Sequence, residues 1–201
     1  MHPTAAFRET DPVSLAALVA ETGLAPVVGF AAGQPVVAQA PALLSDGRLR
    51  FHLSDANPLA GALISEPRAL AVVTGPNAYI SPDWYGIADQ APTWNYLSAE
   101  IEGPLRRLVA GEATGLLDEL SAGFEARLAH KLAWTRAKMS PGRFEAMLGG
   151  IVGFEMTVER LEGVRKLSQN KPAEAQDRPA QALTALGGEH APALARLKAD
   201  G

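Results

Sequence analysis

The sequence predicts an α+β protein built on an antiparallel β-barrel, and three features of the chain indicate this fold class. Six or more short segments have the apolar pattern of strands and recur at regular spacing. Clusters of turn-forming residues separate these segments. Helical segments are inserted between strands instead of alternating with them one for one, which favours a barrel over a doubly wound α/β sheet. The length of 201 residues suits a single domain over residues 1–201.

The first predicted elements are a helix and a pair of strands. Asp11 and Pro12 provide an N-cap and a proline in the first turn, and the helix that they begin is expected to end near Gly23. Two apolar segments, residues 25–32 and 35–40, follow with a short polar connection between them. This spacing is typical of two antiparallel strands joined by a tight turn.

Residues 48–53 alternate strictly between polar and apolar side chains, which predicts a strand with one buried face. The apolar residues of this strand are expected in the core: Leu49, Phe51 and Leu53. The opposite face carries the polar residues: Arg48, Arg50 and His52. Asn57 and Pro58 then repeat the signal of an N-cap followed by proline, so a short helix is predicted to begin there.

The middle of the chain is predicted to form three strands. Residues 69–74 are a compact apolar strand, and Gly75-Pro76-Asn77 is interpreted as a turn after it. Residues 78–81 are expected to return as a second strand. A loop over residues 82–92, rich in turn formers, leads to a long strand over residues 93–103.

The C-terminal half combines two strands with helices. Apolar residues recur at the helical period from residue 114 to about 139, so a helical insertion is predicted over about 111–149. Strict alternation over residues 150–159 predicts a further strand, and a closing strand is expected near 164–167. The Ala-rich tail over about 172–200 has a helical period.

Composition limits the classes of function. The net charge is -4 and there is no cysteine, so the sequence provides no overall attraction for nucleic acid and excludes disulfides and thiolate catalysis. Residues 1–10 lack a basic segment followed by an apolar core, and no apolar run reaches the roughly 18 residues of a membrane span. A cytoplasmic protein is therefore predicted.

Several other kinds of site are not indicated by the sequence. The four histidines have no metal-ligand spacing, so no metal site is predicted. The glycines of residues 149–153 lack the preceding strand and following helix of a dinucleotide-binding loop. A modest basic set lies between residues 114 and 149, which could be a solvated helical face, and no helix-turn-helix is predicted there.

Five segments, in order along the chain, resemble the PaiB-like family of FMN-binding split-barrel proteins. They are residues 52–58, 75–85, 91–96, 150–155 and 166–170. Two motifs are the most specific. Tyr-Ile-Ser-Pro-Asp-Trp-Tyr ends the segment of residues 75–85, and Pro-Thr-Trp-Asn-Tyr ends the segment of residues 91–96. The resemblance implies a split β-barrel, a homodimer with FMN at its interface, and a role as a negative transcriptional regulator that contacts DNA.

The resemblance also suggests which residues bind FMN. Phosphate binding needs converging cationic or donor groups, and the isoalloxazine ring can stack on aromatic side chains. The candidate cofactor-binding residues are His52, Ser54, Asn57, Ser81, Trp84, Thr93, Trp94, Asn95, Lys166, Gln169 and Asn170. Each also has a structural interpretation: a solvated strand face, a helix cap, core aromatics, a backbone partner for the mid-strand amide, or a network at a dimer interface.

The chain departs from the family pattern at two places. Ala38-Gln39 replaces a usual Thr-His, and Asp55 stands where the family commonly has arginine. A carboxylate near the helix that begins at Asn57-Pro58 would repel a phosphate there. Two alternatives to the regulator therefore stay open: an FMN-dependent oxidoreductase similar to flavin reductases, and a flavin-free barrel that binds a partner.

Overall fold

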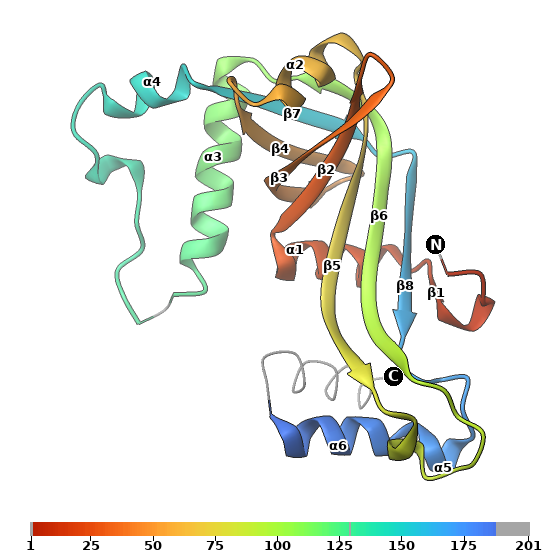
Figure 1. The fold of residues 1–201 in the computed structure, drawn as a ribbon. Helices are drawn as coiled ribbons and strands as arrows, with labels where there is room; N and C mark the ends of the chain where they lie inside the picture. The colour runs from red at the N-terminus through yellow and green to blue at the C-terminus, as the bar shows by residue number, and fades with distance from the viewer. Residues whose placement is uncertain (1, 129, 188–201) are drawn as a thin grey trace. The chain divides into compact units, whose positions relative to one another are not determined.

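The structure is a computed structural model that describes residues 2–128 and 130–187 (Figure 1). The chain divides into two compact units. The barrel unit comprises residues 19–72 and 101–160, and the pocket unit comprises described residues 2–18, 73–100 and 161–187. Strands β5 (Arg68–Ile80) and β6 (Thr93–Arg107) contribute residues to both units. The single domain over residues 1–201 stays a prediction.

Strand pairing confirms the predicted antiparallel barrel. The sheet order is β1-β8-β6-β5-β2-β3-β4-β7, and β6 also pairs with β7, which closes a ring of strands. In this ring Leu105 of β6 lies opposite Met156 of β7. The other strands of the sheet are β1 (Arg8–Glu9), β2 (Leu24–Ala31), β3 (Gln34–Ser45), β4 (Arg48–Ser54), β7 (Ile151–Thr157) and β8 (Arg160–Lys166).

The core of the barrel unit follows the predicted alternation. Leu49, Phe51 and Leu53 of β4 are buried, while Arg48 and Arg50 are not. The pattern arises because successive side chains of a strand point to opposite faces. The Phe51 ring also stacks on the Phe154 ring of β7, with 5.5 Å between ring centroids.

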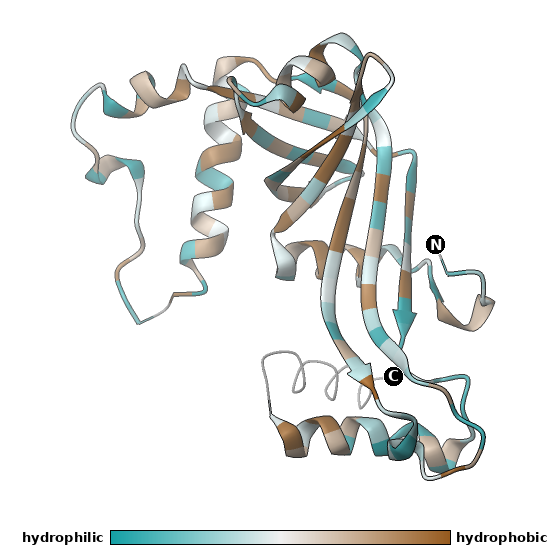
Figure 2. Ribbon diagram, in the orientation of Figure 1, coloured by the Kyte–Doolittle hydropathy of each residue, from teal (hydrophilic) through white to brown (hydrophobic). Residues whose placement is uncertain are grey.

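The hairpin of β2 and β3 is apolar on its outward face as well as its inward face. Val27 points inward and is fully buried, whereas Leu24, Phe30 and Val37 are about half exposed or more. Val28 lies opposite Val37 in the strand register, so these side chains share the outer face. Figure 2 shows the largely apolar character of β2. The barrel unit therefore carries an apolar face with few polar groups.

Helix α2 (Pro58–Ser65) begins where the sequence predicts. The Oδ1 atom of Asn57 accepts a hydrogen bond from the backbone N–H of Leu59 at 2.9 Å, which makes Asn57 the N-cap. Gly29 of β2 lets α2 approach, because a Cβ there would lie 2.7 Å from the Leu63 side chain. The cap and this glycine together fix α2 against the barrel.

Helix α3 (Ala110–Glu125) ends about 14 residues before the predicted helix end near residue 139. Its apolar face packs on β7, β4 and β3. Beyond Glu125 the chain has no such surface, and apolar spacing alone does not stabilise a helix in water. The backbone N–H of Trp134 instead donates to the Glu125 carboxylate at 2.7 Å. Two short elements follow, η3 (Arg136–Lys138) and α4 (Arg143–Leu148).

An ion pair at the start of α3 makes stability depend on pH. Glu112 pairs with Arg106 at 2.8 Å and accepts the backbone N–H of Val109 at 3.0 Å. Arg106 first, and then the Val109 hydrogen bond, lower the Glu112 pKa from 4.5 to about 2. Because the folded pKa is depressed, this stabilisation is present above pH 4.5 and is lost as the pH falls towards 2.

The substitution Glu112→Gln isolates this contribution. We expect the variant to unfold at a lower temperature than the unsubstituted protein at pH 7, because it lacks the charge that pairs with Arg106. We also expect its melting temperature to fall less between pH 4.5 and 2. Circular dichroism melts at several pH values measure both effects. If the melting temperatures of the two proteins fall by the same amount between pH 4.5 and 2, Glu112 does not make this contribution to stability.

The pocket unit combines strand segments with short helices. Residues 12–18 of helix α1 (Pro12–Thr22) belong to it, and β1 pairs antiparallel with β8. Its short elements are η1 (Ala5–Phe7), η2 (Pro82–Tyr85), α5 (Ala173–Gln176) and α6 (Arg178–Leu186). The part of the predicted tail after residue 187 lies outside the described residues.

The predicted turn at Gly75-Pro76-Asn77 is wrong, because β5 continues through it as one strand. A Cβ at Gly75 would lie 2.5 Å from the Leu18 side chain of α1. The glycine therefore serves close helix packing and not chain reversal. No helix in the described parts of the chain is long and apolar enough to cross a membrane.

Candidate functional site

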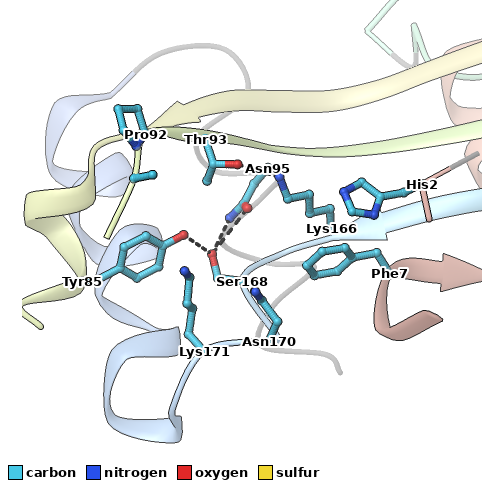
Figure 3. A pocket seen from close by; sticks show the side chains of 11 residues that line it. His2, Phe7, Tyr85, Pro92, Thr93, Asn95, Lys166, Ser168, Asn170 and Lys171 are labelled. Carbon is cyan, nitrogen blue, oxygen red and sulfur yellow. Dashed lines mark hydrogen bonds between the residues drawn. The ribbon is translucent and has the colours of Figure 1, made fainter. Parts of the chain in front are cut away.

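A pocket of about 240 Å³ lies within the pocket unit (Figure 3). Three segments that are remote in sequence supply its walls: the N-terminal residues, the stretch from η2 to the start of β6, and the residues that follow β8. The lining residues are His2, Phe7, Tyr85, Ala91, Pro92, Thr93, Asn95, Lys166, Ser168, Asn170 and Lys171. The walls thus combine aromatic side chains with hydroxyl, amide and ammonium groups.

A buried polar cluster forms one wall of the pocket. The Ser168 hydroxyl lies 2.9 Å from the Tyr85 hydroxyl and accepts a hydrogen bond from the Asn95 side-chain amide at 3.0 Å. Ser168 and Asn95 are the buried polar residues among those described. Ser168 also has a φ of 70°, in the left-handed region that non-glycine residues seldom adopt. The hydrogen bonds hold this strained residue in place, so the wall is rigid.

Two lysines supply the positive charge of the pocket. Lys166 Nζ donates to Thr93 Oγ1 at 2.6 Å, and Lys171 Nζ donates to Gln90 Oε1 at 2.6 Å. Neither ammonium pairs with a carboxylate in the described parts of the chain. Burial first, and then the nearby charge of Lys171, lower the pKa of Lys166. Two cations held close together without an anion create a site that favours the binding of an anion.

Four of the eleven predicted cofactor-binding residues line this pocket: Thr93, Asn95, Lys166 and Asn170. Gln169 does not line it and instead fixes the segment after β8. Its Oε1 accepts the backbone N–H of Leu167 at 2.7 Å, and its Nε2 donates to the Ala6 carbonyl at 3.0 Å. Gln169 therefore positions the wall that carries Ser168.

Three other predicted residues belong to the pocket unit but are not among the lining residues. Ser81 precedes η2, and its carbonyl accepts the backbone N–H of Trp84 at 3.2 Å. Trp94 is 54% exposed and meets the Tyr79 ring edge to face at 6.2 Å between centroids. Trp94 alternates with Thr93 and Asn95 along β6, so it faces away from them.

The remaining predicted residues, His52, Ser54 and Asn57, lie in the barrel unit. Asn57 is the N-cap of α2, and Ser54 is exposed at the end of β4. His52 Nδ1 is buried and has no hydrogen-bond partner among the described residues, and burial lowers the His52 pKa. Asp55 and Gln39, the residues that differ from the family pattern, both belong to the barrel unit, and Asp55 is exposed. Lys166 and Lys171 belong to the pocket unit.

Seven of the eleven lining residues were not among the predicted cofactor-binding residues: His2, Phe7, Tyr85, Ala91, Pro92, Ser168 and Lys171. Tyr85 ends one of the two most specific family segments, so its position there was an available signal. Lys171 directly follows the polar cluster of residues 166–170. His2 and Phe7 carry no local pattern, and only the pairing of β1 with β8 brings their segment to the pocket.

The basic set of the insertion is largely occupied by interactions within the barrel unit. Arg127 donates to the Glu21 carbonyl at 2.8 Å, Lys131 pairs with Glu125, and Arg136 pairs with Asp118 at 3.0 Å. These contacts reduce the charge available for a phosphate backbone. No group of three metal-ligating side chains occurs within the described ranges.

Comparison with known sequences identifies related proteins. Residues 1–160 match the family described as "Putative FMN-binding domain". The chain is 29% identical over 169 residues to the "Protease synthase and sporulation protein PAI 2" of Bacillus subtilis (strain 168), a match that covers 82% of this chain and 80% of that protein.

Solved structures show the same fold at low sequence identity. The flavocytochrome Anf3 from Azotobacter vinelandii superimposes with a TM-score of 0.63 at 16% identity, covering 83% of this chain and 72% of that chain. A FAD and heme binding protein from Mycobacterium smegmatis gives a TM-score of 0.61 at 21% identity, covering 90% and 80% respectively. These matches establish the split-barrel fold.

Proposed function

The chain belongs to this family of FMN-binding domains, and from that premise we propose that its pocket unit binds the phosphate-bearing end of FMN. The observation that carries the proposal is the pair of lysines without carboxylate partners in one pocket. Lys166 and Lys171 would hold the phosphate, and the side chains of Thr93 and Asn170 would add hydrogen-bonding groups. Charge-assisted hydrogen bonds of this kind are the strong ones in phosphate binding.

The size of the pocket supports partial enclosure of the cofactor. Its volume of about 240 Å³ is below the roughly 300–1,000 Å³ of pockets that enclose a drug-sized ligand. A phosphate and part of the ribityl chain fit this space, and the isoalloxazine ring requires a further wall. When bound, FMN supplies electron transfer, while residues of the chain supply binding and orientation.

Titration of the purified protein with FMN tests this proposal. We expect saturable quenching of flavin fluorescence, and much weaker binding of riboflavin, which lacks the phosphate. The comparison isolates the phosphate contact, because the ring and the sugar chain are the same in both ligands. No saturable binding of FMN at low salt would refute the proposal.

We also infer that the protein forms a homodimer through the outward face of the β2–β3 hairpin. Leu24, Phe30 and Val37 are 50%, 49% and 61% exposed on this face. None of the residues paired on this outward face is charged. The pairs are Leu24 with Pro41, Pro26 with Gln39, Val28 with Val37, and Phe30 with Pro35. Interfaces of permanent homodimers are more apolar than other interfaces, and a second copy presents the same uncharged face.

The substitution Val37→Asp tests this interface. An aspartate in the middle of the face would be desolvated without a partner, so we expect a monomer where the unsubstituted protein is a dimer. Gln34→Asp is the matched control, because Gln34 lies opposite Ala31 and points to the other side of the hairpin. Light scattering after size-exclusion chromatography measures the mass. A dimer that persists in V37D would exclude this face.

The other roles stay predictions. Negative transcriptional regulation and DNA contact follow from the family resemblance, and a cytoplasmic location follows from composition. The lysine pair favours cofactor binding over a flavin-free barrel, because unpaired cations in a pocket have an electrostatic cost that an anion removes. An FMN-dependent oxidoreductase would use the same pocket.

A further inference from the structure

The insertion after α3 buries none of its described side chains. Residues 126–150, apart from residue 129, are exposed or partly exposed throughout. Leu132 is 89% exposed, Met147 is 50% exposed and Trp134 is 36% exposed. Ordering a segment costs conformational entropy, and burial of apolar side chains is the main term that offsets it. The insertion therefore lacks the burial that ordered segments of this length have.

Trp134 and Met147 line a pocket of about 190 Å³ within the barrel unit. Leu117 and Ser121 of α3 form one wall, and Trp134, Met139, Phe144 and Met147 of the insertion form the other. Four of the nine lining residues carry thioether or aromatic groups, and three more are aliphatic. Met side chains adapt to the shape of a ligand, and aromatic rings favour another ring in stacked or edge-to-face contact.

The charge beside this pocket is already neutralised. Asp118 lines it, and the Asp118 carboxylate pairs with Arg136 at 3.0 Å. The Arg136 guanidinium also lies over the Phe144 ring, 5.0 Å from its centroid. An ionic ligand would have to compete with this pair, whereas a neutral ligand would not. The site therefore selects uncharged molecules.

We propose that this pocket binds a neutral aromatic molecule of one or two rings. An apolar cavity of about 150 Å³ is large enough to bind benzene, so a pocket of about 190 Å³ takes a ligand of this size. The bound ring supplies the apolar contacts that the insertion lacks, which couples ligand binding to the order of residues 126–150. This site is independent of the proposed FMN site, because it is formed by other residues in the other unit.

Methyl NMR of the full chain, with indole as the probe, tests the proposal. The chain has four methionines. Met139 and Met147 line the pocket, and Met156 is fully buried in the barrel. In protein labelled with ¹³C at the methionine methyl groups, we expect saturable ring-current shifts at Met139 and Met147. The Met156 resonance should not move, and its position reports that the barrel is intact.

A pair of variants makes the test specific. Ser121→Phe places a ring in the pocket and should abolish the saturable shifts. Ala122→Phe is the matched control, because Ala122 is the next residue of α3, is exposed and does not line the pocket. In this variant the Met139 and Met147 resonances should still shift on addition of indole. Shifts that are absent, that spread equally to Met156, or that survive in S121F would overturn the proposal. Met139 and Met147 shifts that depend on protein concentration alone would also overturn the proposal, because they would show that a second copy of the chain occupies the pocket.

Discussion

The double substitution Lys166→Ala with Lys171→Ala is expected to weaken FMN binding by roughly 100-fold. Each lysine is assigned one charge-assisted contact with the phosphate, worth about 1.5 kcal/mol or more, and 1.4 kcal/mol is tenfold in affinity. Riboflavin binding should be nearly unchanged, since riboflavin has no phosphate. Fluorescence titrations of both ligands measure the two effects. The FMN affinity of the unsubstituted protein should also fall as salt is raised, because these side chains are only partly buried.

The matched control is Lys131→Ala with Lys138→Ala, which changes the net charge by the same amount. Lys131 pairs with Glu125, and Lys138 donates to the Ala133 carbonyl, both within the barrel unit. We expect FMN affinity within about twofold of the unsubstituted protein, because neither lysine lines the proposed FMN pocket and salt screens exposed charges. An equal loss in both double variants would mean that net charge, and not the pocket, attracts FMN. An equal loss of riboflavin binding would assign the lysines to the ring.

The substitution Gly103→Ala is expected to destabilise the protein by about 1–3 kcal/mol, the typical cost of an overpacked core. A Cβ at Gly103 would lie 1.9 Å from the carbonyl oxygen of Thr157 and 3.2 Å from Met156 Cγ. The first contact is with backbone, which cannot rotate away as a side chain can. Strand β6 would have to move away from the end of β7, where their pairing closes the barrel. The midpoint of urea unfolding measures the change.

Gly111→Ala provides the comparison for this effect. Nothing lies within 4 Å of a Cβ at Gly111, which is in the first turn of α3. Alanine favours the helix by up to about 1 kcal/mol over glycine, so this variant should be as stable as the unsubstituted protein or slightly more stable. If the two variants have the same unfolding midpoint, the close approach of β6 and β7 does not limit stability.

Much of the fold could be predicted because local signals and tertiary packing agree. The Asn57-Pro58 cap begins α2, and the alternation over residues 48–53 gives the buried face of β4. The errors occur where packing overrides a local signal. Gly75 is typical of a turn, yet it continues a strand because Leu18 occupies the space beside it. Past Glu125 the apolar spacing continues, but there is no surface for a helix to pack on.

The candidate site was predictable only where family segments and local polarity coincide. Lys166 and Asn170 stand in a compact polar cluster after a strand, which is a visible signal. His2 and Phe7 have no such signal, since the chain must fold before their segment reaches the pocket. The assignment of His52 and Asn57 to FMN stays a prediction. Their donor chemistry suits a phosphate, but Asn57 caps a helix and both residues belong to the barrel unit.

The segments that form the proposed FMN pocket are far apart in the sequence, which has a consequence for biosynthesis. Phe7 leaves the ribosome before Lys166 and Lys171, so one wall of the pocket is synthesised well before the other. Contacts between such remote segments form slowly, because a long loop must close before they are gained. Ligand binding in this pocket, as proposed, therefore requires that both segments have been synthesised and brought together. A nascent or partly folded chain exposes each wall alone and cannot retain the ligand.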